Sequence, residues 1–170
     1  MKKDEAHVYD ILQECSHGGE WKFFECFDKF GEPTSQAKNY PNTDYWVAYP
    51  DFEYYNQGKL TLLVECKGYH GYFGNNDYIV AMKYRHYKNY IEVGTKEKIE
   101  VRICFTFLFG DTYDVYWETL GKIARFPRKI APYTQQERNR KTGQIESVTE
   151  DYIFWEVTKF RTDFWNLPVV

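Results

Sequence analysis

The protein has 170 residues, of which 22 are Lys or Arg and 25 are Asp or Glu, so its formal net charge is −3. Aromatic residues make up 20% of the chain. This composition excludes a disordered or collagen-like protein, because such chains lack the bulky apolar side chains that offset the entropy of ordering. A chain of this length is expected to form one domain, residues 1–170, with its own core.

No apolar run follows Lys2 and Lys3, and the longest uncharged apolar stretch, residues 103–110, is far shorter than the roughly 20 residues of a membrane span. The four cysteines are scattered and show no zinc-binding spacing. We therefore expect a soluble, cytoplasmic protein with reduced thiols and no membrane partner.

The first half of the chain predicts one helix and three strands. Residues 4–16 are expected to be helical, because Glu5, Val8, Tyr9 and Leu12 recur on one helical face. The strand-like segments cover residues 21–27, 45–55 and 59–67. Residues 56–58 separate the last two strands and end in glycine, which favours a three-residue hairpin loop.

The second half is expected to contain further helices and strands. Helices are predicted over about residues 77–93 and 116–125, strands over residues 100–109 and 151–160, and an irregular basic loop over residues 126–147. The order α-β-β-β-α-β, followed by a further helix and strand, predicts an α/β fold with a mixed central β-sheet flanked by helices.

The predicted hairpin brings acidic residues together. Because side chains alternate along a strand, Leu63, Glu65 and Lys67 share one face, while Leu62 and its alternate neighbours point into the core. The three-residue loop pairs Tyr55 with Lys59 and Asp51 with Leu63, on the side of Glu65. Asp51, Glu65 and Lys67 are therefore expected to converge, with Glu53 on the same side.

Two or three carboxylates this close repel one another unless a cation neutralises them. Oxygen ligands alone suit a hard divalent ion such as Mg²⁺ or Mn²⁺. A lysine two residues from a metal-binding carboxylate can orient water or stabilise charge that grows on a phosphate. The pattern therefore predicts metal-assisted phosphodiester hydrolysis.

Pro50-Asp51, thirteen further positions and then Glu65-Cys66-Lys67 resemble the motif of PD-(D/E)XK nucleases, which have a restriction-endonuclease-like core. The resemblance covers roughly residues 4–109. It implies a Mg²⁺-dependent nuclease acting on DNA, with Asp51 and Glu65 as metal ligands and Lys67 as the catalytic lysine. The sequence does not decide the oligomeric state. A homodimer is one alternative, because cutting two strands needs two sites.

The same resemblance suggests supporting residues. Many members carry a further Glu on the first helix, where Glu5 fits and Glu14 and Glu20 compete. Some branches have a Gln and a Tyr on the second helix, where Lys83 and Tyr87 are the nearest match and the Gln is absent. A snorkelling lysine beside a core tyrosine is the alternative interpretation.

Nucleic-acid contacts are expected from His70, which follows the acidic strand, and from a basic segment. Residues 122–141 carry a net charge of +6, so the rest of the chain carries −9. The residues expected to contact the phosphate backbone there are Arg125, Arg128, Lys129, Arg138, Arg140 and Lys141. An ordinary solvated loop is the alternative.

Two other functions stay open at this point. The same core could serve as a non-catalytic module that binds protein or nucleic acid, with the many aromatic residues forming the binding surface. A nuclease that acts on RNA would share the same site. Mn²⁺ binding that depends on Asp51 and Glu65 separates the first of these from a nuclease.

Overall fold

A computed structural model describes residues 2–14, 18–23, 49–70, 79–109, 111–139 and 141–162. The main sheet has five strands in the order β1 (Glu20–Phe23), β2 (Phe52–Asn56), β3 (Lys59–His70), β5 (Glu100–Phe109) and β6 (Thr112–Thr119). β3 and β5 are parallel, and the other neighbours are antiparallel. A second, antiparallel sheet has the order β4 (Ile79–Lys83), β8 (Ile145–Glu156) and β7 (Lys129–Arg138).

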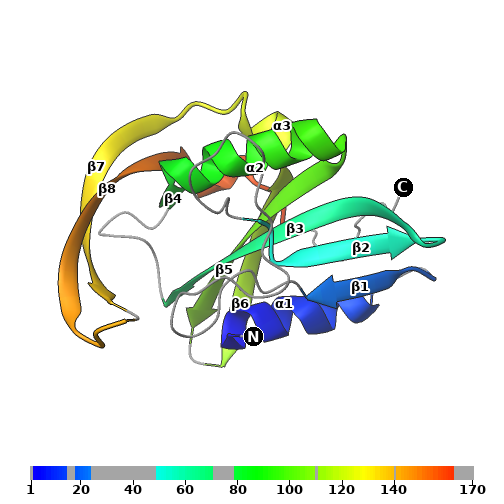
Figure 1. Ribbon diagram of the computed structural model, residues 1–170, viewed down its shortest axis with the longest axis horizontal. Coiled ribbons are helices and arrows are strands. Elements are labelled where there is room, and N and C mark those ends of the chain that lie inside the picture. Colours follow the sequence, from blue (N-terminus) through cyan, green and yellow to red (C-terminus); the bar gives the residue numbers. More distant parts are fainter. Residues whose placement is uncertain are drawn as a thin grey trace.

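Helices cover both faces of the main sheet (Figure 1). Helix α1 (Lys3–Glu14) packs Val8 and Leu12 against one face, and helix α2 (Tyr84–Glu97) packs Tyr90 and Val93, with the second sheet, against the other. The expected α/β fold with a mixed sheet flanked by helices is therefore confirmed. None of the described helices has the length and apolar character needed to cross a membrane.

β3 is buried on both faces, which corrects the expected division into a core face and a surface face. Leu62 and Val64 pack in the core beneath α1, whereas Leu63 packs in the core beneath α2. The nearly continuous apolar run in this strand is typical of a strand covered on both sides. The face that carries Glu65 and Lys67 is thus a buried face.

The predicted second helix begins later than expected. Residues 79–83 form strand β4, and α2 starts at Tyr84. Val80 belongs to the strand, and Ile91 of α2 is 39% exposed. The strand forms because β4 pairs with β8, a contact between distant segments that overrides the local helical pattern.

The predicted helix over residues 116–125 is also wrong for most of its length. Residues 112–119 form β6, because this segment, which is rich in aromatic and β-branched side chains, pairs with β5 along its whole length. Only α3 (Leu120–Ile123) is helical, and the Thr119 hydroxyl caps it by accepting a hydrogen bond from the backbone N–H of Lys122.

The predicted loop over residues 126–147 is largely a β-hairpin. β7 and β8 pair over the full length of β7 and form a long, curved arm at the side of the molecule (Figure 1). In the connection between them, Asn139 Oδ1 accepts hydrogen bonds from the backbone N–H groups of Lys141 and Thr142, and Gly143 has a φ of 72°. Pro132 is tolerated because β7 is an edge strand.

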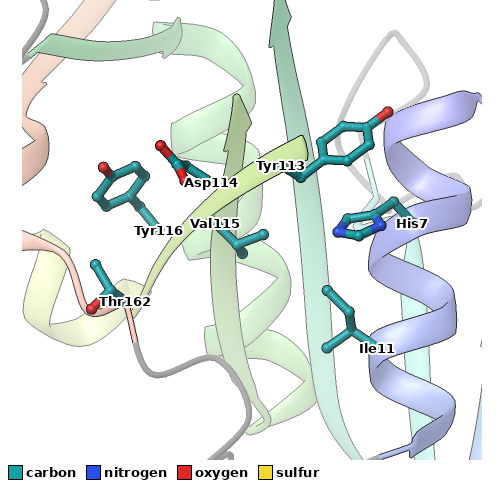
Figure 2. A pocket seen from close by; sticks show the side chains of 7 residues that line it. All are labelled: His7, Ile11, Tyr113, Asp114, Val115, Tyr116 and Thr162. Carbon is teal, nitrogen blue, oxygen red and sulfur yellow. The ribbon is translucent and has the colours of Figure 1, made fainter. Parts of the chain in front are cut away.

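α1 also contacts β6, at the far edge of the sheet from β1. His7 stacks on Tyr113 with ring centroids 4.2 Å apart, beside a hollow of about 250 Å³ between the two elements (Figure 2). Asp114 and Tyr116 border this hollow, and no residue of the predicted catalytic set does within the described part of the chain.

Candidate active site

The β2–β3 hairpin places Asp51 beside Glu65. Asp51 directly precedes β2, and its Oδ2 accepts a hydrogen bond of 2.9 Å from the backbone N–H of Cys66. The observed register pairs Glu53 with Leu63 and Phe52 with Val64, so that Asp51 approaches the level of Glu65.

This register differs from the expected one by two residues, and the expected one is wrong. The turn contains only Gln57 and Gly58, both with positive φ, and pairs Asn56 with Lys59. A bulge between Tyr54 and Tyr55 shifts the pairing by one more residue. Because two single-residue shifts restore the same face, the expected convergence of Asp51 with Glu65 is present despite the wrong register.

Glu65 is a buried carboxylate with one oxygen unused. It is 2% exposed, its Oε1 forms an ion pair with Lys67 Nζ, and its Oε2 has no hydrogen-bond partner among the described residues. Buried carboxylate oxygens usually have partners, because desolvation without compensation is costly. This oxygen can therefore accept a hydrogen bond or bind a cation.

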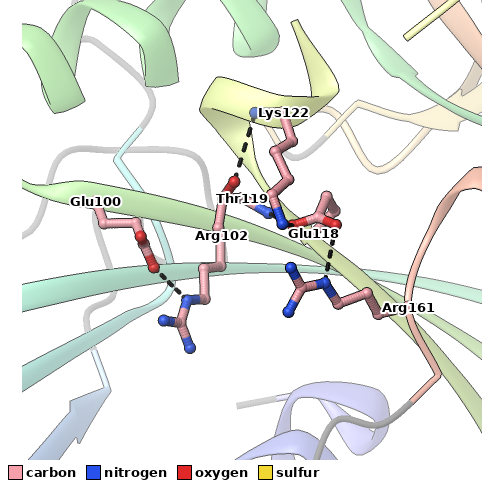
Figure 3. A network of polar contacts seen from close by, with 6 residues as sticks. All are labelled: Glu100, Arg102, Glu118, Thr119, Lys122 and Arg161. Carbon is pink, nitrogen blue, oxygen red and sulfur yellow. Dashed lines mark hydrogen bonds and ion pairs between the residues drawn. The ribbon is translucent and has the colours of Figure 1, made fainter. Parts of the chain in front are cut away.

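Glu118, a second buried carboxylate, provides a comparison with Glu65 (Figure 3). Glu118 is 3% exposed, and both of its oxygens are used. Oε1 accepts a hydrogen bond of 2.8 Å from the backbone N–H of Thr119, and Oε2 accepts one of 3.1 Å from Arg161 Nε. Lys122 adds an ion pair at 3.7 Å, so Glu118 is fully compensated where Glu65 is not.

The environment also perturbs Asp51. Burial raises its pKa well above the usual range, and the neighbouring Glu65 raises it further; Lys67 and the hydrogen bond from Cys66 oppose this rise. A carboxyl group whose anionic form is disfavoured by a second carboxylate can be returned to that form by a bound cation. Asp51 and Glu65 thus form an under-neutralised pair.

Glu5 lies near this pair, whereas its competitors do not face the core. Glu5 is 7% exposed and contributes to the raised pKa of Asp51. Lys2 binds it through the backbone nitrogen at 2.6 Å and through Nζ at 3.4 Å. Glu14 and Glu20 are exposed.

Glu53 lies on the same face as Leu63 and is also buried, at 5% exposure. The hydroxyl groups of Tyr49 and Tyr55 each donate to one of its oxygens, both at 2.9 Å. Its carboxylate is therefore already held by two phenols, in contrast to Glu65.

The carboxylate pair fits a hard divalent cation with few protein ligands. Within the described ranges, no group of three or more His, Cys, Asp or Glu side chains is arranged to hold a metal ion by itself. Mg²⁺ commonly binds one or two carboxylates and completes its shell with water and substrate phosphate. The unused Glu65 oxygen and the disfavoured charge of Asp51 match that incomplete donor set.

The structure separates Lys83 and Tyr87, which were expected on one helix. Lys83 ends β4 and forms ion pairs with Glu137 at 2.7 Å and Glu150 at 2.9 Å. Tyr87 is a core residue of α2, with its ring 5.5 Å from that of Trp155. Lys83 shares a small cavity with Lys67, but Tyr87 does not line it.

The basic residues of the predicted loop fall into two groups along β7. Arg125, Arg128 and Lys129 lie at its start, and Arg138 and Lys141 lie at the other end. The two groups therefore lie at opposite ends of this ten-residue strand, and their contact with a phosphate backbone stays a prediction. Arg140 lies outside the described residues, and His70 is the last residue of β3.

Three residues that the sequence did not single out lie next to Lys67. His86, Gln135 and Tyr152 line, together with Lys67 and Lys83, a cavity of about 180 Å³. His86 has no second metal ligand at a recognisable spacing, and Gln135 falls in the supposed loop. No apolar alternation marks β7 as a strand, so the sequence carries no clear signal for the position of Gln135.

Comparisons with known proteins give little at the level of sequence: no protein-family model matches the chain, and no curated protein does. Among solved structures, the chain is similar to Hjc, a Holliday junction resolvase from the archaeal hyperthermophile Archaeoglobus fulgidus. The match covers 70% of this chain and 76% of that one, with a TM-score of 0.44 and 10% sequence identity.

Proposed function

We propose that the protein is a metal-dependent nuclease that hydrolyses phosphodiester bonds in DNA. The observation that carries this proposal is the under-neutralised pair of partly buried Asp51 and buried Glu65, with a Glu65 oxygen that has no hydrogen-bond partner among the described residues and a lysine beside it. The PD-(D/E)XK-like spacing of these residues on one hairpin supports the same conclusion.

Asp51 and Glu65 would hold Mg²⁺ or Mn²⁺, which when bound supplies positive charge for the scissile phosphate and an activated water. Lys67 lies 27% exposed at the edge of the cluster, where its ammonium group can orient the attacking water and stabilise the growing negative charge. Glu5 would add a carboxylate through water, since it lies near Asp51.

The test is an activity panel with single-stranded, duplex and branched DNA and with RNA, with and without Mg²⁺. Wild-type protein is compared with Glu65→Gln and Lys67→Ala, and with Glu156→Gln as a control, because Glu156 is an exposed carboxylate. We expect metal-dependent cleavage by wild type and the control only. Equal cleavage by the Glu65 and Lys67 variants would show that the chemistry lies elsewhere.

Metal binding is measured separately, by Mn²⁺ titration under electron paramagnetic resonance. We expect one site that is lost in Asp51→Asn and Glu65→Gln and retained in Glu156→Gln. A wild-type protein that neither binds Mn²⁺ nor cleaves any substrate would instead favour the non-catalytic binding module. Cleavage of RNA alone would move the assignment to an RNA nuclease that uses the same site.

A further inference from the structure

The cavity beside Lys67 joins the catalytic hairpin to the second sheet. Lys67 contributes from β3, Lys83 from β4, His86 from α2, and Gln135 and Tyr152 from the β7–β8 arm. Since Lys67 belongs both to the carboxylate cluster and to the wall of this cavity, a group bound in the cavity would adjoin a phosphate at the cluster.

Two of the side chains that line the cavity, His86 and Tyr152, are uncharged. Burial, reinforced by the charges of Lys67, Arg85 and Lys83, lowers the pKa of His86 to about 2, so its imidazole is uncharged. Burial and nearby carboxylates raise the pKa of Tyr152 to about 12, so its hydroxyl stays protonated. Within the described residues neither group donates or accepts a hydrogen bond.

Gln135 is held in place by its neighbours. Its amide nitrogen donates to Glu137, which in turn pairs with Lys83. One further N–H and the amide oxygen of Gln135 stay available for a ligand. An amide, a phenol and an uncharged imidazole together offer several donors and acceptors without net charge.

The cations around the cavity are already paired, which argues against a site for phosphate alone. Lys67 pairs with Glu65, and Lys83 pairs with Glu137 and Glu150. Arg85 also binds Glu150. The positive charge available to a bare anion is therefore small, whereas the neutral hydrogen-bonding groups suit the edge of a nucleobase.

The size of the cavity agrees with this interpretation. At about 180 Å³ it is smaller than the pockets of roughly 300–1,000 Å³ that hold drug-sized ligands. It therefore suits one planar ring system, with the sugar and the phosphate outside. The ring of Tyr133 packs edge-on against Tyr152 at 5.3 Å and fixes that side chain.

We propose that this cavity receives one nucleobase, that of the nucleotide next to the scissile phosphate, through hydrogen bonds from Gln135, Tyr152 and His86. The proposal rests on the proposed nuclease function and names its substrate class. A base enters such a cavity only when it has left the stack of a duplex. The preferred substrate therefore has an unpaired nucleotide at the cut, in a single strand, a flap or a branch.

The binding test needs neither metal nor cleavage. Metal-free protein is titrated with each 2′-deoxynucleoside 5′-monophosphate and with 2-deoxyribose 5-phosphate, and binding is followed by NMR at the imidazole of His86. We expect at least one nucleotide to bind about tenfold more tightly than the sugar phosphate, the effect expected for one good base contact.

Gln135→Ala should remove this preference, and Tyr152→Phe should weaken it. Gln136→Ala is the matched control, because Gln136 is the adjacent amide of β7 and donates instead to Ser147 Oγ at 2.7 Å. Equal affinity for nucleotide and sugar phosphate, no binding of either, or equal losses in Gln135→Ala and Gln136→Ala would each overturn the proposal.

The cleavage test uses Mg²⁺ and a substrate scanned with an abasic nucleotide around the cut. Wild type should lose about tenfold in kcat/KM when the abasic position adjoins the scissile phosphate, and Gln135→Ala should show no further loss there. Continuous duplex cut as fast as an unpaired strand, with no abasic effect, would refute the nucleobase site but leave the nuclease intact. Absence of all metal-dependent cleavage would instead refute the proposed function.

Discussion

Two lysine-carboxylate clusters adjoin the cavity, one through Lys67 and one through Lys83, and they differ in their charge balance. In the first, Lys67 forms an ion pair with Glu65 beside Asp51, Glu65 Oε2 has no hydrogen-bond partner among the described residues, and the pKa of Asp51 is raised by burial and by Glu65. In the second, Lys83 and Arg85 together bind Glu150, and Lys83 also binds Glu137.

The second cluster is compensated. Burial alone would raise the pKa of Glu150, but hydrogen bonds and charges from Arg85 and Lys83 outweigh it, so this pKa lies below its usual value. The pKa of Glu137 is also lowered, because hydrogen bonds from Lys83 and Gln135 and the charge of Lys83 outweigh the effect of burial. The same residue types thus leave negative charge uncompensated around Asp51 and Glu65, whereas Lys83, Arg85, Glu137 and Glu150 form a compensated network, the structural clamp.

The largest expected difference between the two clusters is in catalysis. Lys67→Ala should lower kcat for DNA cleavage by about 100-fold or more, because it removes charge stabilisation at the reacting phosphate. Single-turnover cleavage measures the loss, and circular dichroism checks that the variant is folded. Lys96→Ala, at an exposed position of α2, should cleave like wild type; a similar loss in both variants would contradict the distinction.

Lys83→Met tests the clamp. It should lower the free energy of unfolding by about 2 kcal/mol, because Glu137 and Glu150 each lose a partly buried partner. Urea unfolding measures this change. Lys96→Met should cost only about 0.3–0.5 kcal/mol, as expected for an exposed helical ion pair with Glu92. Equal losses would show that the clamp adds nothing.

Asp51→Asn should raise the stability of the metal-free protein, whereas Lys83→Met lowers it. In metal-free protein it removes a charge that burial and Glu65 disfavour, so the Tm should rise by a few degrees. The same variant should no longer gain stability when Mn²⁺ is added. Thermal melts in EDTA and in Mn²⁺ check both results, and Glu118→Gln, which breaks a satisfied network, should lower the Tm. A lower Tm for Asp51→Asn in EDTA would contradict an under-neutralised pair.

The smallest expected effect is the pH dependence of the stability that Glu150 contributes to the clamp. The pKa of Glu150 is lower in the folded protein than its ordinary value of 4.5, so its stabilising effect is full above that pH. It is lost as the pH falls through the folded-state pKa. The stability gap between wild type and Glu150→Gln should therefore narrow between about pH 6 and pH 3. Unfolding midpoints across this range measure the gap, and a constant gap would contradict the linkage.

The hairpin and its acidic residues could be predicted because their signals are local. Alternation places Glu65 and Lys67 on one face whatever the partner strand, and Asp51 reaches that face by any even shift in register. The register itself could not be predicted, because a positive φ at Gln57 and a bulge at Tyr55 leave no clear mark in the sequence.

The second sheet was missed for a different reason. The sequence of β4 is typical of the start of a helix, and the sequence of β7 is typical of a polar loop. Both segments are strands because they pair with β8. Edge strands carry few buried residues, so β7 lacks the apolar alternation that identifies a strand. The cavity could not be predicted for the same reason, because Gln135 and Tyr152 lie near Lys67 only as a result of those pairings between distant segments.

This difference in sequence separation has a consequence for folding kinetics. Asp51 and Cys66, which join across the hairpin, are 15 residues apart, whereas Lys83 and Glu150 are 67 apart. Contacts that close short loops form faster than those that close long ones. The carboxylate pair should therefore be assembled before the arm docks, and during synthesis the growing chain would contain the β2–β3 hairpin, with Asp51 beside Glu65, well before β8 completes the adjoining cavity.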